Sequence, residues 1–303
     1  MPHGPPPVVA VVGATAAGKS ELALDLAGRL GGEIVNTDAM QVYIGMDIGT
    51  AKLPLAERRG IAHHLLDFMA VTETANVAEF QRLGRATIAQ CHQRDRTPVL
   101  VGGSALYTRA ILDELDFPGT DPVVRGRLET EDAAHGSRAL HERLTELDPA
   151  AAAEIDVGNG RRIIRALEVI ELTGRAFKAR LPEPAYHYPG TVQVGVSIDR
   201  PALDDRVARR VDQMWAQGLV EEVRRLAEAG LRESRTASRA MGYQQVLAFL
   251  AGELTEEQAR EQTVAATRRF ARRQESWFRK DHRIAWVRYD DPDRVEKALR
   301  SLS

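Results

Sequence analysis

Residues 13–20 read GATAAGKS and match the pattern G-x-x-x-x-G-K-[ST] of loops that wrap around phosphate groups. Before them, residues 8–12 (VVAVV) are apolar and mostly β-branched, which predicts a strand buried on both faces of a parallel sheet. After them, apolar residues recur at helical spacing from Leu22 to Leu30, and Gly31 ends the pattern. A buried strand, this loop and a helix in that order constrain the chain to an α/β fold with an anion site at the start of the helix.

Strand and helix patterns alternate along much of the chain. Residues 33–38 (EIVNTD) and 98–103 (PVLVGG) are short strand patterns, and residues 78–94 between them have helical periodicity. Strand patterning returns in residues 191–199 (TVQVGVSID) and in a last run, residues 284–289 (IAWVRY), which we expect to close the fold. This order predicts βαβ units, and therefore an α/β fold with the parallel sheet of P-loop nucleoside triphosphate hydrolases and kinases.

The middle of the chain differs from its two ends. Between Gly119 and Arg180 only helical periodicity is found, and Pro118 and Pro182 bracket the block. We therefore expect a helical insertion domain at residues 119–185, within a P-loop core formed by residues 1–118 and 186–303 with its C-terminal helices. The expected helices are residues 123–135, 137–147, 150–155 and 161–172 in the insertion, and 201–217, 219–229, 243–250 and 255–280 after it.

The phosphate loop contains the donors that a polyphosphate needs. Lys19 is expected to neutralise terminal phosphate oxygens, and Ser20 to bind Mg²⁺. An enzyme that hydrolyses ATP also needs an acid at a strand end to hold the metal, but residues 98–103 end in glycines. The acid that follows a strand is instead Asp38. The residues expected to bind phosphate are Gly13, Ala14, Thr15, Ala16, Ala17, Gly18, Lys19 and Ser20.

Composition limits the class of protein. Of 303 residues, 44% are hydrophobic and 28% are charged, which is typical of a globular chain and excludes a collagen-like, disulfide-rich or wholly disordered one. No run approaches the ~18 apolar residues of a membrane span. The single Cys91 cannot form an internal disulfide, and the first residues do not resemble a leader peptide. We expect a cytoplasmic protein.

The balanced charge of the chain conceals a basic segment. There are 41 Lys and Arg against 43 Asp and Glu, and a net charge of −2 argues at first sight against a nucleic-acid partner. From Arg268 to Arg288, however, eight basic residues stand against two acids, a local charge of +6. Trp277, Phe278 and Trp286 lie among them. A basic segment with interleaved aromatic residues predicts a surface for the phosphate backbone of a nucleic acid.

Several motifs together resemble one family. Besides GATAAGKS they are DAMQVYIGMDIGTAK (38–52), GIAHHLLD (60–67), VGGSALY (101–107), RRIIRALEVI (161–170), SRAMGYQQV (238–246) and RRQESWFRKD (272–281). With these motifs in this order over nearly its whole length, the chain resembles the bacterial tRNA isopentenyltransferase family, the tRNA dimethylallyltransferases. The resemblance implies transfer of a dimethylallyl group from dimethylallyl diphosphate to the N6 amine of adenosine 37 in tRNA, giving N6-(dimethylallyl)adenosine and diphosphate.

The same resemblance implies partners and a mechanism. The insertion domain would clamp the anticodon stem-loop of tRNA, Mg²⁺ would be the cofactor, and the enzyme would be a monomer. The phosphate loop would hold a diphosphate leaving group rather than ATP, so no acid is needed to activate water. Because the adenine amine is a weak nucleophile, a carboxylate is expected to orient it and accept its proton, and cations to stabilise the departing diphosphate. We expect the target base to be extruded from its stack into a pocket.

The resemblance assigns roles to individual residues. Asp38 would be the general base, Arg210 would contact the distal phosphate, and Ser104 would contact the target nucleotide from a position where the family has Thr. Contacts with tRNA are implied for Asp38, Ala39, Met40, Gln41, Ser104, Arg125, Arg161, Arg162, Ile163, Ile164, Arg165, Arg239, Ala240, Met241, Gly242, Tyr243 and Gln244.

Three other functions compete with this one at the level of sequence. A P-loop small-molecule kinase would bind ATP. An isopentenyltransferase that acts on free adenine nucleotides would not need the helical insertion or the basic segment. An RNA-binding protein with an inactive phosphate loop would not need Asp38 or an intact Lys19 and Ser20.

His63 and His64 lie near Asp67 in one motif and suggest a metal. No third ligand at a compatible spacing accompanies them, so we expect a structural role for these residues.

Overall fold

Two compact units make up the chain. The structure, a computed structural model, describes residues 5–179 and 181–302. Unit 1 comprises Met1–Asp113 and Tyr186–Ser303, and unit 2 comprises Glu114–Ala185. The polypeptide therefore leaves unit 1 once and returns once, and its exit lies a few residues before the boundary at Pro118 expected from the sequence.

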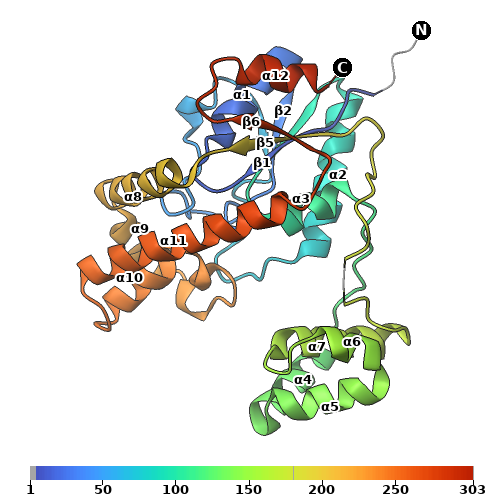
Figure 1. Ribbon diagram of the computed structural model, residues 1–303. Helices are drawn as coiled ribbons and strands as arrows, with labels where there is room; N and C mark the ends of the chain where they lie inside the picture. The colour runs from blue at the N-terminus through green and yellow to red at the C-terminus, as the bar shows by residue number, and fades with distance from the viewer. Residues whose placement is uncertain (1–4, 180, 303) are drawn as a thin grey trace. The chain divides into compact units, whose positions relative to one another are not determined.

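Unit 1 is built on a six-stranded sheet with the order β3-β2-β4-β1-β5-β6, in which neighbouring strands run parallel (Figure 1). The predicted α/β fold with a parallel sheet is confirmed. Sequence analysis missed β3, because an edge strand of two residues is too short to show alternation. The strands are β1 (Val9–Gly13), β2 (Glu33–Asn36), β3 (His63–His64), β4 (Pro98–Val101), β5 (Val192–Ser197) and β6 (Ile284–Arg288).

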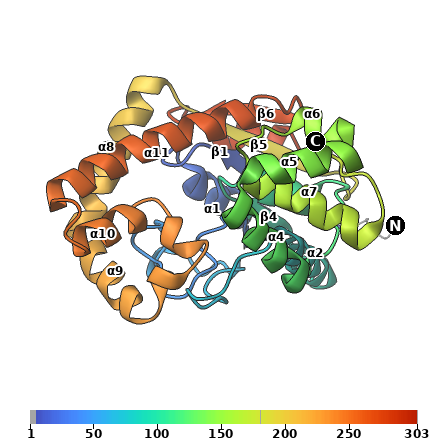
Figure 2. The same cartoon turned by 90° about the horizontal axis from the view of Figure 1, so that it is seen from below.

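The helices of unit 1 follow the predicted periodicities, with two short additions, α3 and α12. The expectation that residues 284–289 close the fold is wrong, because α12 follows β6 and packs against α1. Helices α8 to α11 pack on one another at one end of the unit (Figure 2). Their bounds are α1 (Lys19–Leu30), α2 (Val77–Gln93), α3 (Ala105–Leu112), α8 (Arg200–Ala216), α9 (Leu219–Glu228), α10 (Tyr243–Leu250), α11 (Glu256–Phe278) and α12 (Arg294–Arg300), with 3-10 turns at Leu55–Glu57, Leu231–Glu233 and Ala237–Arg239.

Strand β1 is buried on both faces, as its apolar run predicts. Ala10 and Val12 belong to a core shared with α2 and α3. Val9 and Val11 belong to a second core, shared with α1. Successive side chains of a strand point to opposite faces, so a single apolar run can support two layers of helices. The loop after β1 is therefore fixed between these layers.

Unit 2 is helical and has its own core, which includes Leu128, Leu144 and Ile163. The side chains of Asp121 and Asp148 accept hydrogen bonds from the first turns of α4 and α6, and a proline follows each of them. An acidic cap followed by proline is a strong start signal for a helix, which explains why the sequence located these helices well. The helices are α4 (Pro122–His135), α5 (Ser137–Leu147), α6 (Pro149–Glu154) and α7 (Gly160–Thr173).

An arginine anchors the two chain segments where they leave and re-enter unit 1. Asp113 and Tyr186 form an isolated antiparallel bridge at this point. Arg283 donates to the buried carboxylate of Asp113 at 2.8 Å and to Asp281 at 2.7 Å, and its guanidinium lies 4.0 Å from the centroid of the Tyr186 ring. A buried carboxylate requires such a paired cation, so Arg283 holds both ends of the insertion in unit 1.

Helix α9 places a carboxylate in the interior of unit 1. Glu222 is 3% exposed, and its oxygens accept hydrogen bonds from the backbone N–H groups of Asp47, Ile48 and Gly49 at 3.1, 2.9 and 3.2 Å. The hydroxyl of Tyr243 donates a further bond at 2.5 Å. These donors compensate the burial of the charge and tie residues 47–49 to α9 and α10.

We expect Glu222→Leu to lower the free energy of unfolding by about 3 kcal/mol, because several buried donors lose their acceptor. The matched control is Glu221→Ala, which removes an exposed neighbour whose pair with Arg224 spans 3.5 Å and should cost about 0.5 kcal/mol or less. Urea denaturation of both variants measures the difference. Equal stabilities of the two variants would contradict the role of Glu222.

Candidate active site

Three loops meet at the carboxyl edge of the sheet. Residues 13–20 follow β1, residues 37–41 follow β2, and residues 102–104 follow β4. Because β2, β4 and β1 are adjacent and parallel, the loops after them lie side by side. The order of the strands therefore brings together motifs that lie far apart in the sequence.

The phosphate loop has the backbone of an anion cradle. Ala16 and Gly18 have positive φ angles of 63° and 99°, and α1 begins at Lys19. The loop thus directs backbone N–H groups and the helix N-terminus toward one point, where an anion is stabilised. The ammonium group of Lys19 lies over the loop and donates to the carbonyl of Ala14 at 2.7 Å.

Two arginines of α8 add positive charge beside Lys19. Arg206 donates from Nε to the carbonyl of Ala16 at 2.8 Å, and its guanidinium lies 5.5 Å from the centroid of the Tyr289 ring. Arg210 is half-buried; burial lowers its pKa and repulsion from Arg206 lowers it further. A cavity of about 550 Å³ opens here, and Lys19, Arg206 and Arg210 all line it. Arg59, paired with Asp25, and two acids, Glu21 and Glu57, also line the cavity, so basic residues outnumber acids on its wall and favour an anionic ligand.

Asp38 is held at the start of the loop after β2. Its N–H donates to Oδ1 of Asn36 at 2.8 Å, and its own Oδ1 accepts from the N–H of Met40 at 2.9 Å, so a local turn orients the carboxylate. Burial raises the pKa of Asp38, while the Met40 amide and the charge of Lys19 oppose the rise. Burial also lowers the pKa of Lys19 to about 8, with repulsion from Arg210 adding to the effect and Asp38 opposing it. The expected base and the phosphate-binding lysine therefore act on each other.

The loop after β4 touches the Asp38 loop directly. A Cβ at Gly102 would lie 2.8 Å from the backbone nitrogen of Asp38, so only glycine allows this approach. The hydroxyl of Ser104 accepts a hydrogen bond from the N–H of Ala39 at 3.2 Å. Asp38 and Ser104, assigned to the target nucleotide from separate motifs, lie side by side.

Gln274 of α11 lies between the phosphate loop and the loop after β4. Its Oε1 accepts from the N–H of Thr15 at 2.8 Å, and its Nε2 donates to the carbonyl of Gly103 at 2.8 Å. The N–H of Thr15, expected to bind phosphate, is thus engaged within the protein. Sequence analysis missed Gln274, because one glutamine in a basic helix carries no chemical signature.

Ser20 is exposed in the first turn of α1 and lines the cavity with Lys19. Its hydroxyl is an oxygen ligand of the kind that Mg²⁺ prefers, and a bound diphosphate would supply further oxygens. The residues present therefore fit a Mg²⁺ ion held between Ser20 and the diphosphate.

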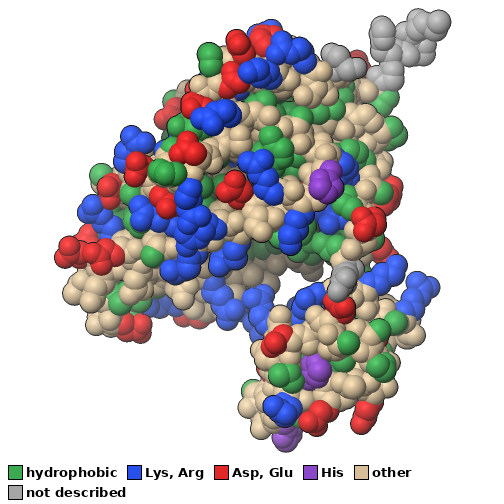
Figure 3. Space-filling model, in the orientation of Figure 1, with side chains coloured by type: hydrophobic (Ala, Val, Ile, Leu, Met, Phe, Trp, Pro, Cys, Tyr) green, Lys and Arg blue, Asp and Glu red, His purple; other side chains and the backbone are tan. Residues whose placement is uncertain are grey.

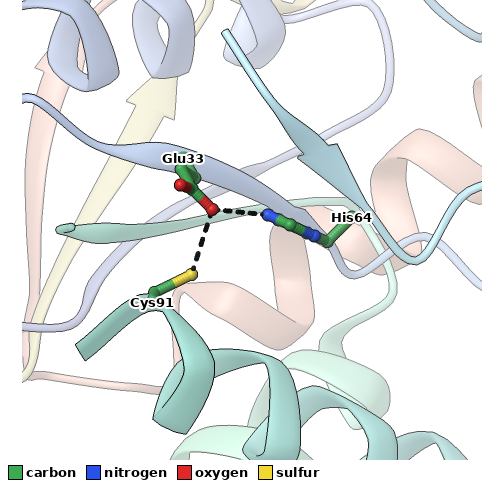
Figure 4. Close-up of side chains that lie close together, drawn as sticks. All are labelled: Glu33, His64 and Cys91. Carbon is green, nitrogen blue, oxygen red and sulfur yellow. Dashed lines mark hydrogen bonds and ion pairs between the residues drawn. The ribbon is translucent and has the colours of Figure 1, made fainter. Parts of the chain in front are cut away.

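A separate cluster lies at the amino end of β2. Glu33, His64 and Cys91 point toward one another, with Oε2 of Glu33 2.7 Å from Nε2 of His64 and 3.6 Å from Sγ of Cys91 (Figure 4). The same Oε2 lies 2.7 Å from the guanidinium of Arg94, and burial together with the charge of Glu33 raises the pKa of Cys91 to about 11. Glu33 thus accepts from His64, Cys91 and Arg94 at once, and the three contacts form a hydrogen-bonded and ion-paired cluster at this end of the sheet. Asp67 does not join it and pairs instead with Lys52, the last residue of the motif 38–52.

The residues of unit 1 expected to contact tRNA differ in exposure. Arg239 and Gln244 are exposed, whereas Ala240 and Tyr243 are buried in the core. The hydroxyl of Tyr243 donates to Glu222, which in turn holds residues 47–49, so this side chain has a structural contact inside unit 1. Of the other expected contacts, Ala39, Met40, Gln41 and Met241 are half-buried and Gly242 is buried.

Within unit 2, two of the expected arginines bind a buried acid. Arg125 and Arg165 both pair with Glu168, which is 0% exposed, and Arg165 also donates to the carbonyl of Gly119 at 3.0 Å. Their charges are therefore largely used inside the unit, where they join α4 to α7. Of the neighbouring expected contacts, Arg161 and Arg162 are exposed, and the side chains of Ile163 and Ile164 are buried in the core.

The basic segment that begins at Arg268 is only partly available to a ligand. Arg283 is used in ion pairs, and Phe278, expected among the surface aromatic residues, is 4% exposed and belongs to the core. Among the described residues, Arg269, Arg272 and Arg273 of α11 are exposed and form no ion pair. Lys and Arg side chains gather over this helix in Figure 3. These three arginines form the α11 basic face.

Comparison with known proteins decides the family. Residues 41–281 match the family model described as IPP transferase. The chain belongs to the IPP transferase family. It is 66% identical to the tRNA dimethylallyltransferase of Nocardioides sp., over 97% of this chain and 94% of that protein. It is 62% identical to the tRNA dimethylallyltransferase of Thermobifida fusca, over 96% and 93% of the two chains. The resemblance found in the motifs is confirmed, and this member of the IPP transferase family is a transferase enzyme.

Solved structures agree with this assignment. The tRNA isopentenylpyrophosphate transferase of Bacillus halodurans superimposes with a TM-score of 0.71 at 39% identity, covering 98% of this chain and 94% of that one. A eukaryotic dimethylallyltransferase acting on tRNA gives a TM-score of 0.82 at 25% identity, covering 94% of this chain and 74% of that one.

Within residues 5–179 and 181–302, no helix is long and apolar enough to cross a membrane.

The pKa of Lys19 predicts how diphosphate binding depends on pH. Below pH 8 the lysine is protonated with or without ligand, so the affinity for dimethylallyl diphosphate should be constant. A bound anion raises the pKa of Lys19, so above pH 8 binding must return a proton and the affinity should fall by up to about tenfold per pH unit. The last ionisation of the diphosphate itself, with a pKa of about 6, is nearly complete at these pH values and does not contribute to the fall. Calorimetry without tRNA, from pH 7 to 9.5, measures this.

The control is Lys19→Arg, whose charge does not titrate in this range. Whatever affinity this variant has for dimethylallyl diphosphate, we expect that affinity to be the same at every pH from 7 to 9.5. A wild-type affinity that stays constant up to pH 9.5 would contradict the assigned pKa.

We expect the α11 basic face to bind the tRNA backbone. Replacing Arg269, Arg272 and Arg273 together by Ala should weaken tRNA binding about 10–100-fold near 0.1 M salt, and should lower the slope of log K against log salt by about one per lost phosphate contact. The matched control removes the same charge from exposed arginines outside the basic segment that have acidic partners: Arg29, Arg82 and Arg224. An equal loss of tRNA affinity in both triple variants would contradict the prediction, because it would show that only the net charge of the chain matters.

Proposed function

We propose that this chain transfers the dimethylallyl group of dimethylallyl diphosphate to the N6 amine of adenosine 37 in tRNA and releases diphosphate. The observation that carries the proposal is the proximity of Asp38 to Lys19. A carboxylate suited to accept a proton lies within electrostatic reach of the cation that holds an anion. The loop after β4 offers glycines and Ser104 in place of an acid, which suits an alkyl transfer better than hydrolysis of ATP.

In the proposed reaction the N6 nitrogen attacks C1 of the dimethylallyl group, and the bond from C1 to the diphosphate oxygen breaks. Asp38 accepts the proton that the amine loses, so that the product amine is neutral. The raised pKa of Asp38 strengthens it as a base. Ser104, bonded to the N–H of Ala39 beside it, would orient the extruded base.

The leaving diphosphate gains negative charge as the bond to carbon breaks. Lys19, Arg206 and Arg210 line the cavity beside the phosphate loop, so their charges are already in place when that charge develops. A Mg²⁺ ion held by Ser20 would neutralise further charge on the diphosphate.

We propose that tRNA is bound through the anticodon stem-loop, with the α11 basic face contacting its backbone. A monomeric state and a cytoplasmic location stay predictions.

Incubation with dimethylallyl diphosphate, Mg²⁺ and unmodified tRNA, followed by mass analysis of the nucleosides, tests the proposal. We expect one prenylated adenosine per tRNA and an equal amount of released diphosphate. A tRNA with guanosine at position 37 is the control and should stay unmodified. Absence of a prenylated adenosine, or thermal stabilisation by ATP without stabilisation by dimethylallyl diphosphate, would overturn the proposal.

Asp38→Asn should separate chemistry from binding. The amide keeps the size of the side chain and can still accept from the N–H of Met40, but it cannot take the proton. We expect kcat to fall at least about 100-fold, with the Kd for tRNA changed less than about threefold. Asp205→Asn, exposed on α8, is the control and should leave both values unchanged. A weakened tRNA affinity with normal kcat would assign Asp38 to binding instead.

A further inference from the structure

We propose that Gln274 is a positioning residue that sets the separation between the diphosphate cradle and the loops that hold the target amine. The inference rests on the proposed function, and it concerns a residue that takes no part in the reaction steps described above. The hydrogen bonds of the Gln274 side chain go to Thr15 and Gly103, so it would act on Asp38 and Lys19 through the backbone of the loops that carry them.

The contacts of Gln274 suit this role. Its side chain is 5% exposed, and its amide joins two loops that are 88 residues apart in the sequence, from Thr15 to Gly103. One loop offers a donor, the N–H of Thr15, and the other an acceptor, the carbonyl of Gly103, each at 2.8 Å. A primary amide has both a donor and an acceptor, so it can bridge this pair of backbone groups. A buried amide with both ends bonded has one preferred orientation.

The path between the two halves of the reaction is short. On one side, Thr15 belongs to the loop that ends at Lys19. On the other, Gly103 is followed by Ser104, whose hydroxyl accepts from the N–H of Ala39 beside Asp38. The Gln274 amide therefore joins the backbone that binds the leaving group to the backbone that holds the base.

Precise separation matters because attack of nitrogen on carbon requires the two atoms to approach closely and in line with the leaving oxygen. A misplacement of about 1 Å can cost on the order of 100-fold in rate. The phosphate loop would still bind the donor and the basic surface would still bind tRNA if Gln274 were lost. We therefore expect kcat to depend on Gln274 much more than either KM.

The first test is Gln274→Glu, which has nearly the same shape. An ionised carboxylate can accept from Thr15 but repels the carbonyl of Gly103, whereas a protonated one can donate to it. We expect kcat at pH 8.5 to be at least tenfold below that of the wild type, with both KM values within threefold. Because burial raises the pKa of the new carboxyl, the ratio of variant to wild-type kcat should rise as the pH falls toward 6. A ratio near one throughout, or a loss expressed mainly in KM, overturns the proposal.

The control for simple destabilisation is Thr263→Val in the same helix. Thr263 is 2% exposed, and its hydroxyl donates only within α11, to the carbonyl of Ala259. Melting temperatures are measured for both variants, and assays are run well below the lower one. If Thr263→Val lowers kcat as much as Gln274→Glu at similar stability, the effect is structural and the proposal fails.

A second route leaves α11 unchanged. A Cβ at Gly103 would lie 2.3 Å from Nε2 of Gln274, so Gly103→Ala should displace the amide and lower kcat in the same way. Gln274→Ala, made as the matching single variant, removes the same link. The double variant Gly103→Ala/Gln274→Ala should therefore lose no more activity than the worse of these two single variants. Multiplied losses would overturn the proposal. Wild-type turnover in the same assay keeps this outcome distinct from a failure of the proposed function, in which the wild type itself gives no product.

Discussion

In the proposed reaction, a carboxylate that accepts a proton and a diphosphate share one edge of the sheet, and they would repel each other without cations nearby. Lys19, whose charge acts on Asp38, and Arg210, whose charge acts on Lys19, supply that positive charge. Binding of the diphosphate adds negative charge near Asp38, which raises the pKa of the carboxyl and strengthens the base. The same anion raises the pKa of Lys19 and keeps it charged. In the proposed reaction, binding of the donor would therefore prepare both groups: it would make Asp38 a stronger base and keep Lys19 charged.

The parallel sheet makes this arrangement possible because it brings three loop backbones within contact distance. The loops approach so closely that side chains must be absent at two positions. Gly102 leaves room for the backbone of Asp38, and Gly103 leaves room for the amide of Gln274. The two glycines therefore serve different contacts. Gly102 allows the close approach of the Asp38 loop, and Gly103 allows the contact with Gln274. Helix α11 contributes to the site from the side, through one buried glutamine.

The sequence predicts what local periodicity and local motifs determine. The β1 strand, the phosphate loop and helix α5 could be located because each has its signal within about a dozen residues. β3 and α3 could not, because they are short and depend on their neighbours in the fold. Gln274 and Glu222 were also missed: a polar residue in an amphipathic helix reads as solvent-exposed, and only tertiary contacts with distant loops reveal that it is buried. That Asp38 and Lys19 belong to one site could be predicted from the resemblance of the motifs to the family. The shifts of their pKa values could not, because these depend on burial and on neighbouring charges in the folded chain.

Counts of basic residues overstate the surface that can bind RNA. Arg283 neutralises Asp113 at the junction, and Arg125 and Arg165 neutralise Glu168 inside unit 2. A charge paired with a buried acid is held in place by the desolvation that breaking the pair would cost, so it is not released to a phosphate group. Exposed arginines without partners carry no such cost. The three arginines of the α11 basic face are of this kind, and they lie on the same helix that places Gln274 between the phosphate loop and the loop after β4.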